Sequence, residues 1–143
     1  MSNEIMQAPG IGTMLSNVGN DVFCTVRMDT PKEQARVFNA INNPTHKLGD
    51  VIGSTIWVQD VVAEMAEFED ENGEMVQTPR IVFIDRDGET YQCTSIGVMS
   101  SLKRLMAQFG APTWEGGLPL IVRQQNTKGT NRVYVLELDV DKM

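Results

Sequence analysis

Residues 79–114 read PRIVFIDRDGETYQCTSIGVMSSLKRLMAQFGAPTW and predict one β-hairpin that runs into one amphipathic helix. Two β-rich runs flank the Asp87-Gly88 pair, which is a strong hairpin signal. From residue 98 to residue 109 the apolar side chains keep helical spacing, and Gly110 ends the helix. This hairpin and helix are the centre around which we place the rest of the chain.

Five β-rich segments follow residue 53, with one helix between the third and the fourth. The predicted strands are 54–68, 80–85, 89–96, 118–125 and 132–140. This order is typical of the OB-fold, a five-stranded Greek-key barrel. In the first strand the apolar alternation shifts near Asp60, which predicts a bulge or strong bend. We therefore predict a mainly β fold, a five-stranded OB-like barrel with the helix at one end. An α+β domain with an open five-stranded sheet is the alternative.

The 143 residues fit one domain with a loose N-terminal arm. Residues 1–19 show no sustained period and predict a flexible arm. Residues 20–143 form the single OB-like domain, in which 20–53 are a strand-helix extension and 54–140 the barrel. The helix of the extension starts with a capping box at Thr30 and Glu33. We expect residues 45–53 to be a connecting loop.

Acidic residues outnumber basic ones, 19 to 12, which gives a formal charge of −7. This argues against a protein that coats duplex DNA by bulk charge. Eight of the acids lie between Lys47 and Arg80, where there is no basic residue. The remaining chain is about neutral, so a local basic face elsewhere is compatible with the composition.

The sequence offers few candidates for a catalytic site. The chain has no phosphate-binding Gly-rich loop, no nucleophile elbow, and only one histidine, His46. Cys24 and Cys93 lack ligand spacing and are expected to be free thiols. Asp85 and Asp87 are interpreted as turn residues, and a metal-dependent hydrolase or nuclease built on them is the weakest alternative. We predict no enzyme, no cofactor and no metal site.

The sequence offers more candidates for a binding site, because aromatic and basic side chains interleave on the predicted strands. Stacking of a base on an exposed ring contributes roughly 1–3 kcal/mol. The candidate nucleic-acid-binding residues are Trp57, Arg80, Arg86, Tyr91, Trp114, Arg123, Lys128, Arg132 and Tyr134. Each of these rings can pack in the core instead, and Phe83 is expected to do so. In an OB-fold the ligand crosses strands two and three, between the acidic 69–78 turn and the 126–131 turn.

Several segments together resemble the single-stranded DNA-binding proteins of small tailed bacteriophages. They are 37–42, 60–62, 79–88, 95–105 and 109–114, and the likeness covers about residues 37–138. The resemblance implies a replication accessory protein that coats displaced single strands without strong sequence preference and does no chemistry. It implies single-stranded DNA as partner, with RNA and other replication proteins left open, and no contact with a membrane. Unlike bacterial single-stranded DNA-binding proteins, the chain does not end in a disordered acidic tail.

Two further expectations accompany this hypothesis. The chain has no apolar run long enough to span a membrane and no signal pattern, so we expect a soluble protein of the host cytoplasm. The extra N-terminal strand offers an edge through which copies of the chain can associate. The alternative function is a non-enzymatic interaction module whose acidic hairpin docks on a basic partner.

Overall fold

The computed structural model describes residues 22–126 and 132–143, so the predicted arm at 1–19 and Lys128 lie outside the described residues. The elements are β1 (Val22–Cys24), α2 (Pro31–Asn42), β2 (His46–Lys47), the 3-10 helix η2 (Leu48–Val51), β3 (Thr55–Glu69), β4 (Met75–Asp85), β5 (Thr90–Cys93), α3 (Ile96–Phe109), β6 (Leu118–Asn126), β7 (Arg132–Leu138) and η3 (Val140–Lys142). After residue 53 the elements follow the order of three strands, a helix and two strands, with the 3-10 helix η3 at the end.

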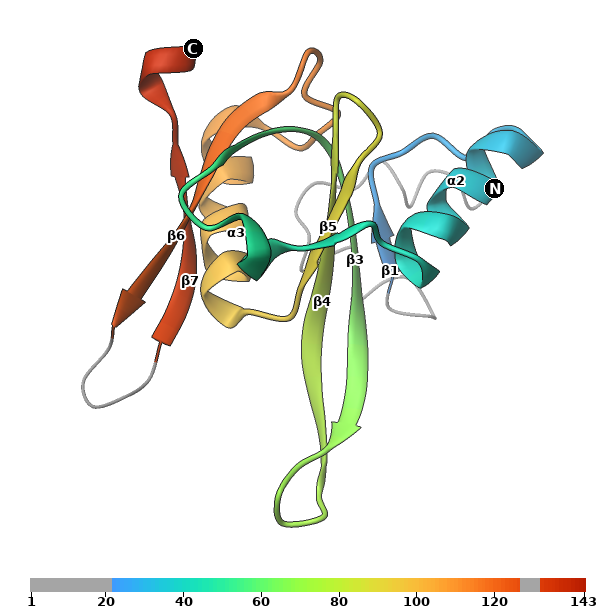
Figure 1. Cartoon of the computed structure of the whole chain (residues 1–143). Helices are drawn as coiled ribbons and strands as arrows, with labels where there is room; N and C mark the ends of the chain where they lie inside the picture. Colours follow the sequence, from blue (N-terminus) through green and yellow to red (C-terminus); the bar gives the residue numbers. More distant parts are fainter. Residues whose placement is uncertain (1–21, 127–131) are drawn as a thin grey trace.

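The strands that the structure describes form one seven-stranded sheet, in the order β2-β5-β4-β3-β6-β7 with β1 paired to β3. β3 is the shared strand. One of its edges pairs with β4, while the other holds β6 at Thr55–Val58 and β1 at Val62–Glu64. The sheet curls around α3 (Figure 1). The mainly β, barrel-like class is therefore confirmed.

The sheet is an open half-barrel, and the closed five-stranded ring is not found. Closure would pair β5 with β7, but no such pairing occurs within residues 22–126 and 132–143. Instead β2 runs parallel to β5, with Lys47 opposite Gln92. The prediction of a plain loop at 45–53 was wrong, because this segment contains β2 and η2. Thr45 holds it to β5, since the Thr45 amide donates to Thr90 Oγ1 at 2.8 Å and the Thr90 amide donates to Thr45 Oγ1 at 2.9 Å.

At the other end of the sheet, the outer edge of β7 is covered by α3 rather than by another strand. Ser101 of α3 faces this edge. It is 8% exposed, and its Oγ accepts a hydrogen bond from the Leu136 amide of β7 at 3.1 Å. A buried hydroxyl therefore satisfies a strand edge that would otherwise lack a partner.

Side chains on the two faces of the sheet pack into two cores. On the concave face Ile81 and Phe83 of β4 pack with Leu102 of α3, all at 0% exposure. On the convex face Val82 and Ile84 pack under α2. Because both faces of β4 are covered, its sequence lacks the polar alternation of a half-exposed strand. The expected core position of Phe83 is confirmed.

The predicted bend in the first barrel strand is confirmed at Asp60. The β3–β4 register shifts between Val58 and Asp60, as in a β-bulge. Asp60 is 7% exposed, and its Oδ1 accepts hydrogen bonds from Thr25 Oγ1 at 2.8 Å and Thr113 Oγ1 at 2.5 Å. The bulge thus lets β3 pair with β6 on one side of the bend and with β1 on the other.

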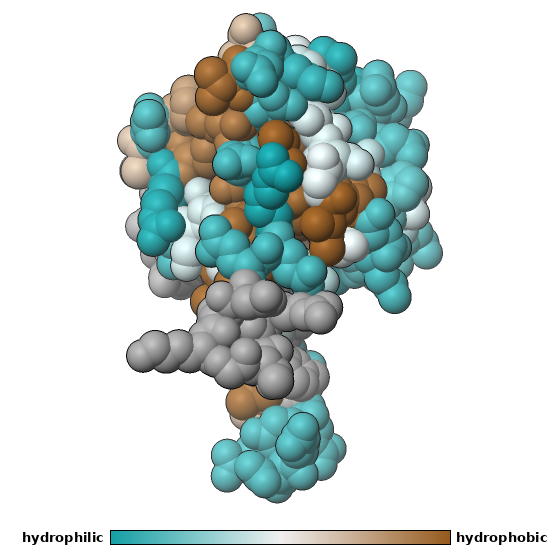
Figure 2. Space-filling view, turned by 60° about the vertical axis from the view of Figure 1, so that its left-hand side comes forward, coloured by the Kyte–Doolittle hydropathy of each residue, from teal (hydrophilic) through white to brown (hydrophobic). Residues whose placement is uncertain are grey.

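The far half of the β3–β4 hairpin projects from the body of the molecule (Figure 1), and its tip is hydrophilic (Figure 2). Asp70 builds this tip, because its Oδ1 accepts from the amides of Asn72 and Glu74, both at 2.9 Å. Within the described part of the chain no helix is long and apolar enough to cross a membrane.

Candidate nucleic-acid interface

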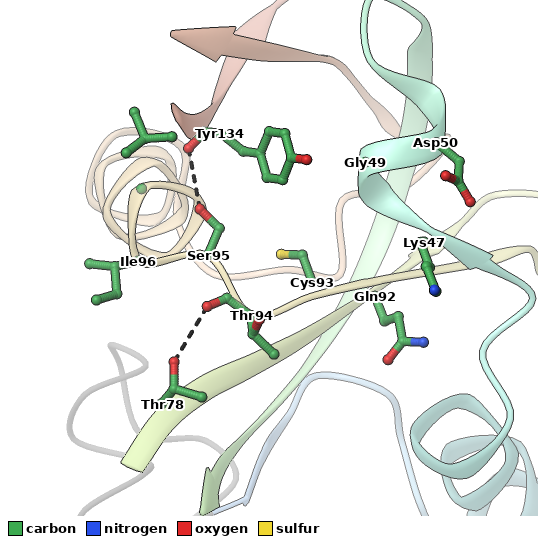
Figure 3. A pocket seen from close by; sticks show the side chains of 12 residues that line it. Lys47, Gly49, Asp50, Thr78, Gln92, Cys93, Thr94, Ser95, Ile96 and Tyr134 are labelled. Atoms are coloured by element: carbon green, nitrogen blue, oxygen red, sulfur yellow. Dashed lines mark hydrogen bonds between the residues drawn. The ribbon is translucent and has the colours of Figure 1, made fainter. Parts of the chain in front are cut away.

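An open groove of about 750 Å³ lies where β5 and β7 diverge, and we call it the β5–β7 groove (Figure 3). Its walls come from the β2–η2 segment, the end of β5, the start of α3 and β7. The lining residues are Lys47, Gly49, Asp50, Thr78, Gln92, Cys93, Thr94, Ser95, Ile96, Gly97, Val133 and Tyr134. One ammonium and one carboxylate are present, so most of the lining is uncharged.

Among the predicted site residues, Tyr134 lines the groove directly. Ser95 Oγ donates to the Tyr134 carbonyl oxygen at 3.4 Å, which ties β7 to the start of α3. Gly49 lies against the other end of the residue, since a Cβ there would be 3.0 Å from the Tyr134 hydroxyl oxygen. Tyr134 therefore has Gly97 against its backbone carbonyl and Gly49 against its hydroxyl, and the polar end of its ring points toward η2 (Figure 3). This is the position that suits stacking with one face wet.

Arg80 lies beside the groove but does not line it. Its Nη1 donates to Glu64 Oε2 at 3.1 Å, and its Nε and Nη2 donate to Gln92 Oε1 at 3.3 and 3.1 Å. The Arg80 side chain is 17% exposed. Its charge is therefore already paired and partly removed from solvent.

Trp57 and Arg86 are brought together on another surface, outside the lining of the groove. The Arg86 guanidinium carbon lies 4.2 Å from the centroid of the Trp57 ring, a cation–π contact. Arg86 Nη1 also donates to the Gly116 carbonyl oxygen at 3.4 Å. We call this pair the Trp57–Arg86 stack. It presents a half-buried indole and an exposed guanidinium together.

Tyr91 is 9% exposed and belongs to the concave core. It stacks on His46 with centroids 4.9 Å apart, and its hydroxyl donates to Asp85 Oδ2 at 3.3 Å. Burial and the nearby Asp85 raise the pKa of Tyr91 to about 12. The ring leaves little surface on which a base could stack.

The other predicted residues are spread over the molecule. Trp114 packs against the concave core, its amide donates to the Gln59 carbonyl oxygen at 2.9 Å, and its Nε1 donates to the Gly110 carbonyl oxygen at 3.1 Å. Arg123 is exposed on β6 and paired with Glu137 at 2.8 Å. Arg132 begins β7, but its side chain is not described. The structure thus gathers no single basic stripe from these positions.

The groove contains two residues that sequence reasoning missed, Lys47 and Gln92. Lys47 lay in a segment expected to be a loop, and Gln92 lay in a strand without any charge or ring to mark it. Only the parallel β2–β5 pairing places them side by side. No local sequence pattern predicts a pairing between segments so far apart.

The residues that resembled a catalytic or metal site have structural roles. Asp85 Oδ1 accepts from the amides of Asp87 and Glu89, both at 2.9 Å, so the interpretation of a turn is confirmed. Cys24 and Cys93 are free thiols, and burial raises the pKa of each to about 11. Within residues 22–126 and 132–143 no group of three His, Cys, Asp or Glu side chains is placed to hold a metal ion.

We compared the chain with known protein families. The family described as Phage Single-stranded DNA-binding protein matches residues 16–139. The chain belongs to this family. Neither the curated proteins nor the solved structures gave a match. Membership of the phage single-stranded DNA-binding protein family confirms the resemblance seen in residues 37–138, and it supports single-stranded DNA as the partner class.

Proposed function

We propose that this phage single-stranded DNA-binding protein coats displaced strands during phage DNA replication, without strong sequence preference, through the β5–β7 groove. The observation that carries the proposal is the groove itself, an open groove of about 750 Å³ with Tyr134 in its wall. An open groove is accessible to a polymer, and an aromatic ring accepts any base. The groove also includes Thr78 of β4 and Gln92 of β5, the second and third barrel strands over which the ligand passes in an OB-fold.

Charge argues for few phosphate contacts. The net charge is −7, Asp50 lines the groove together with Lys47, and Arg80 and Arg123 have carboxylate partners. Each phosphate contact on a single strand contributes about −0.7 to the slope of log affinity against log salt. We therefore expect a shallow slope of about −1 to −2, with stacking as the larger contribution. The Trp57–Arg86 stack offers a second contact for strands that extend beyond the groove.

The test is a titration with labelled oligo-dT followed by fluorescence anisotropy at several salt concentrations. Tyr134→Ala should weaken binding by roughly 1–3 kcal/mol, the contribution of one stacked base, and Tyr134→Phe should keep it. Phe38→Ala, at a position 63% exposed on α2, is the matched control and should change nothing. Oligo-dA, oligo-dC and an RNA strand serve as competitors. Absence of oligo-dT binding by the unaltered protein would contradict the proposal.

A second candidate function rests on the projecting hairpin. Glu67, Glu69, Glu71 and Glu74 are exposed on a segment that extends beyond the body (Figure 1). Such a tip suits a basic surface of another replication protein. Replacing these four by Gln should abolish capture of that partner and leave oligo-dT affinity unchanged, with Asp70 kept because it builds the turn. Undiminished capture by this variant would exclude the hairpin as a docking element.

A further inference from the structure

We propose that the Gln92 side-chain amide contacts DNA bases directly and prefers those that carry carbonyl oxygens, with Arg80 as the residue that positions it. This rests on the proposed function, because the groove that Gln92 lines is the one assigned to the strand. It assigns Arg80 a different role from the phosphate contact that its charge suggests.

Three side chains from adjacent strands form the supporting row. Glu64 of β3, Arg80 of β4 and Gln92 of β5 lie on the convex side of the sheet, beyond the part that α2 covers. Arg80 holds Glu64 Oε2 at 3.1 Å on one side and Gln92 Oε1 at 3.1 and 3.3 Å on the other. Two bonds from one rigid guanidinium to a single oxygen fix the position of the amide.

The chemistry of the pair decides which way the amide faces. A guanidinium has five N–H donors and no acceptor, so only the oxygen of Gln92 can face it. The Gln92 NH₂ must then point away from Arg80, and within the described residues it donates to no other group. Gln92 lines the groove and Arg80 does not. The arrangement therefore presents a fixed pair of N–H donors to the groove.

Lys47 strengthens this donor character. It lies opposite Gln92 in the β2–β5 pairing, and both line the groove (Figure 3). An amide NH₂ beside an ammonium suits a carbonyl oxygen. Thymine has two carbonyl oxygens, and guanine and cytosine have one each. Adenine accepts only at its ring nitrogens, and the usual paired contact of an amide with adenine needs the amide oxygen for the N6 amino group, whereas Arg80 occupies that oxygen. The contact therefore adds a modest preference for thymine over adenine to a mode of binding that otherwise accepts any sequence.

Gln92→Glu is the decisive variant. A carboxylate keeps the bond to Arg80, and so the fold, but replaces the donors by acceptors that repel a carbonyl oxygen. We expect affinity for oligo-dT to fall roughly tenfold and affinity for oligo-dA to fall no more than about threefold. Gln108→Glu, the same charge change at an exposed position of α3, is the control and should leave the ratio of the two affinities unchanged.

Arg80→Gln tests the positioning role. Arg104→Gln, with the same charge change on the exposed side of α3, is the control. If Arg80 only orients Gln92, Arg80→Gln lowers the preference for oligo-dT over oligo-dA. The salt slope of its binding then equals that of the control. A slope shallower than in that control by about 0.7 would show a phosphate contact and overturn this role. Equal losses on both oligonucleotides in Gln92→Glu would overturn the base contact. Either failure, with the unaltered protein still binding oligo-dT, leaves the proposed function standing.

Discussion

Among the glycines that the structure describes, Gly97 is the one where an added Cβ would come closest to another atom. An added Cβ would overlap the Tyr134 carbonyl oxygen, a backbone atom that cannot turn away. Gly97→Ala should therefore push β7 from α3, lowering the free energy of unfolding by about 1–3 kcal/mol. Because Tyr134 moves with β7, oligo-dT binding should weaken as well. Urea denaturation measures the first effect, and Ser100→Ala, exposed in the same helix, should change stability by less than about 0.5 kcal/mol.

Tyr91 makes the stability of the protein depend on alkaline pH. Its pKa is raised from 10.0 to about 12, chiefly by burial and then by Asp85. Between these values the unfolded chain loses the phenolic proton and the folded chain keeps it. The stabilisation is therefore complete below about pH 10 and is lost as pH rises toward 12. Tyr91→Phe should flatten the decline of urea midpoints over this range. Parallel curves for the Tyr91 variant and the unaltered protein would contradict this account.

The start of α2 is an element that local sequence determines. The predicted capping box is present, since the Glu33 amide donates to Thr30 Oγ1 at 3.2 Å and the Thr30 amide donates to Glu33 Oε1 at 3.1 Å. Thr30→Ala should lower the free energy of unfolding by about 1 kcal/mol, the usual contribution of an N-cap. Lys32→Ala, in the same turn without a capping role, should have less effect, and equal effects would refute the assignment. Thermal unfolding of both variants provides the comparison.

Elements with local signals were predictable from the sequence, and those made by distant contacts were not. The Asp87-Gly88 turn and the helix end at Gly110 each depend on neighbouring residues, and the bulge at Asp60 appears in the sequence as a local shift of the apolar alternation. β2 has only two residues, and Thr45 secures it through a partner 45 positions away. Such a strand has no period for a sequence pattern to reveal.

The same distinction governs the candidate site. Residue type marked Tyr134 and Arg80 as candidates for binding, but it did not indicate what each would contact. Arg80 is occupied by Glu64 and Gln92 because three strands place these side chains in one row, and a single strand's sequence contains no such information. The groove exists because β5 and β7 do not pair, which is a property of the whole sheet.

On the scale of the molecule, the two proposed aromatic contacts are Tyr134 in the β5–β7 groove and Trp57 in the Trp57–Arg86 stack. They lie at different sites, because neither Trp57 nor Arg86 lines the groove. A strand of about five nucleotides, near the lower limit for an OB-type site, should fill the groove and leave tryptophan emission nearly unchanged. A strand of about thirty nucleotides should also reach the Trp57–Arg86 stack, where a base competes with the guanidinium for the indole face and quenches its emission.

Trp57→Phe separates the two contacts. It should remove the quench by the long strand and weaken its binding by roughly 1 kcal/mol, while the affinity of the short strand stays the same. Trp114→Phe is the control, since Trp114 packs on the concave core, and the quench should survive it. Strong quenching by the short strand would place Trp57 on the primary path of the DNA. A difference between the two strands that disappears in Trp57→Phe and persists in Trp114→Phe therefore comes from the Trp57 contact beyond the groove.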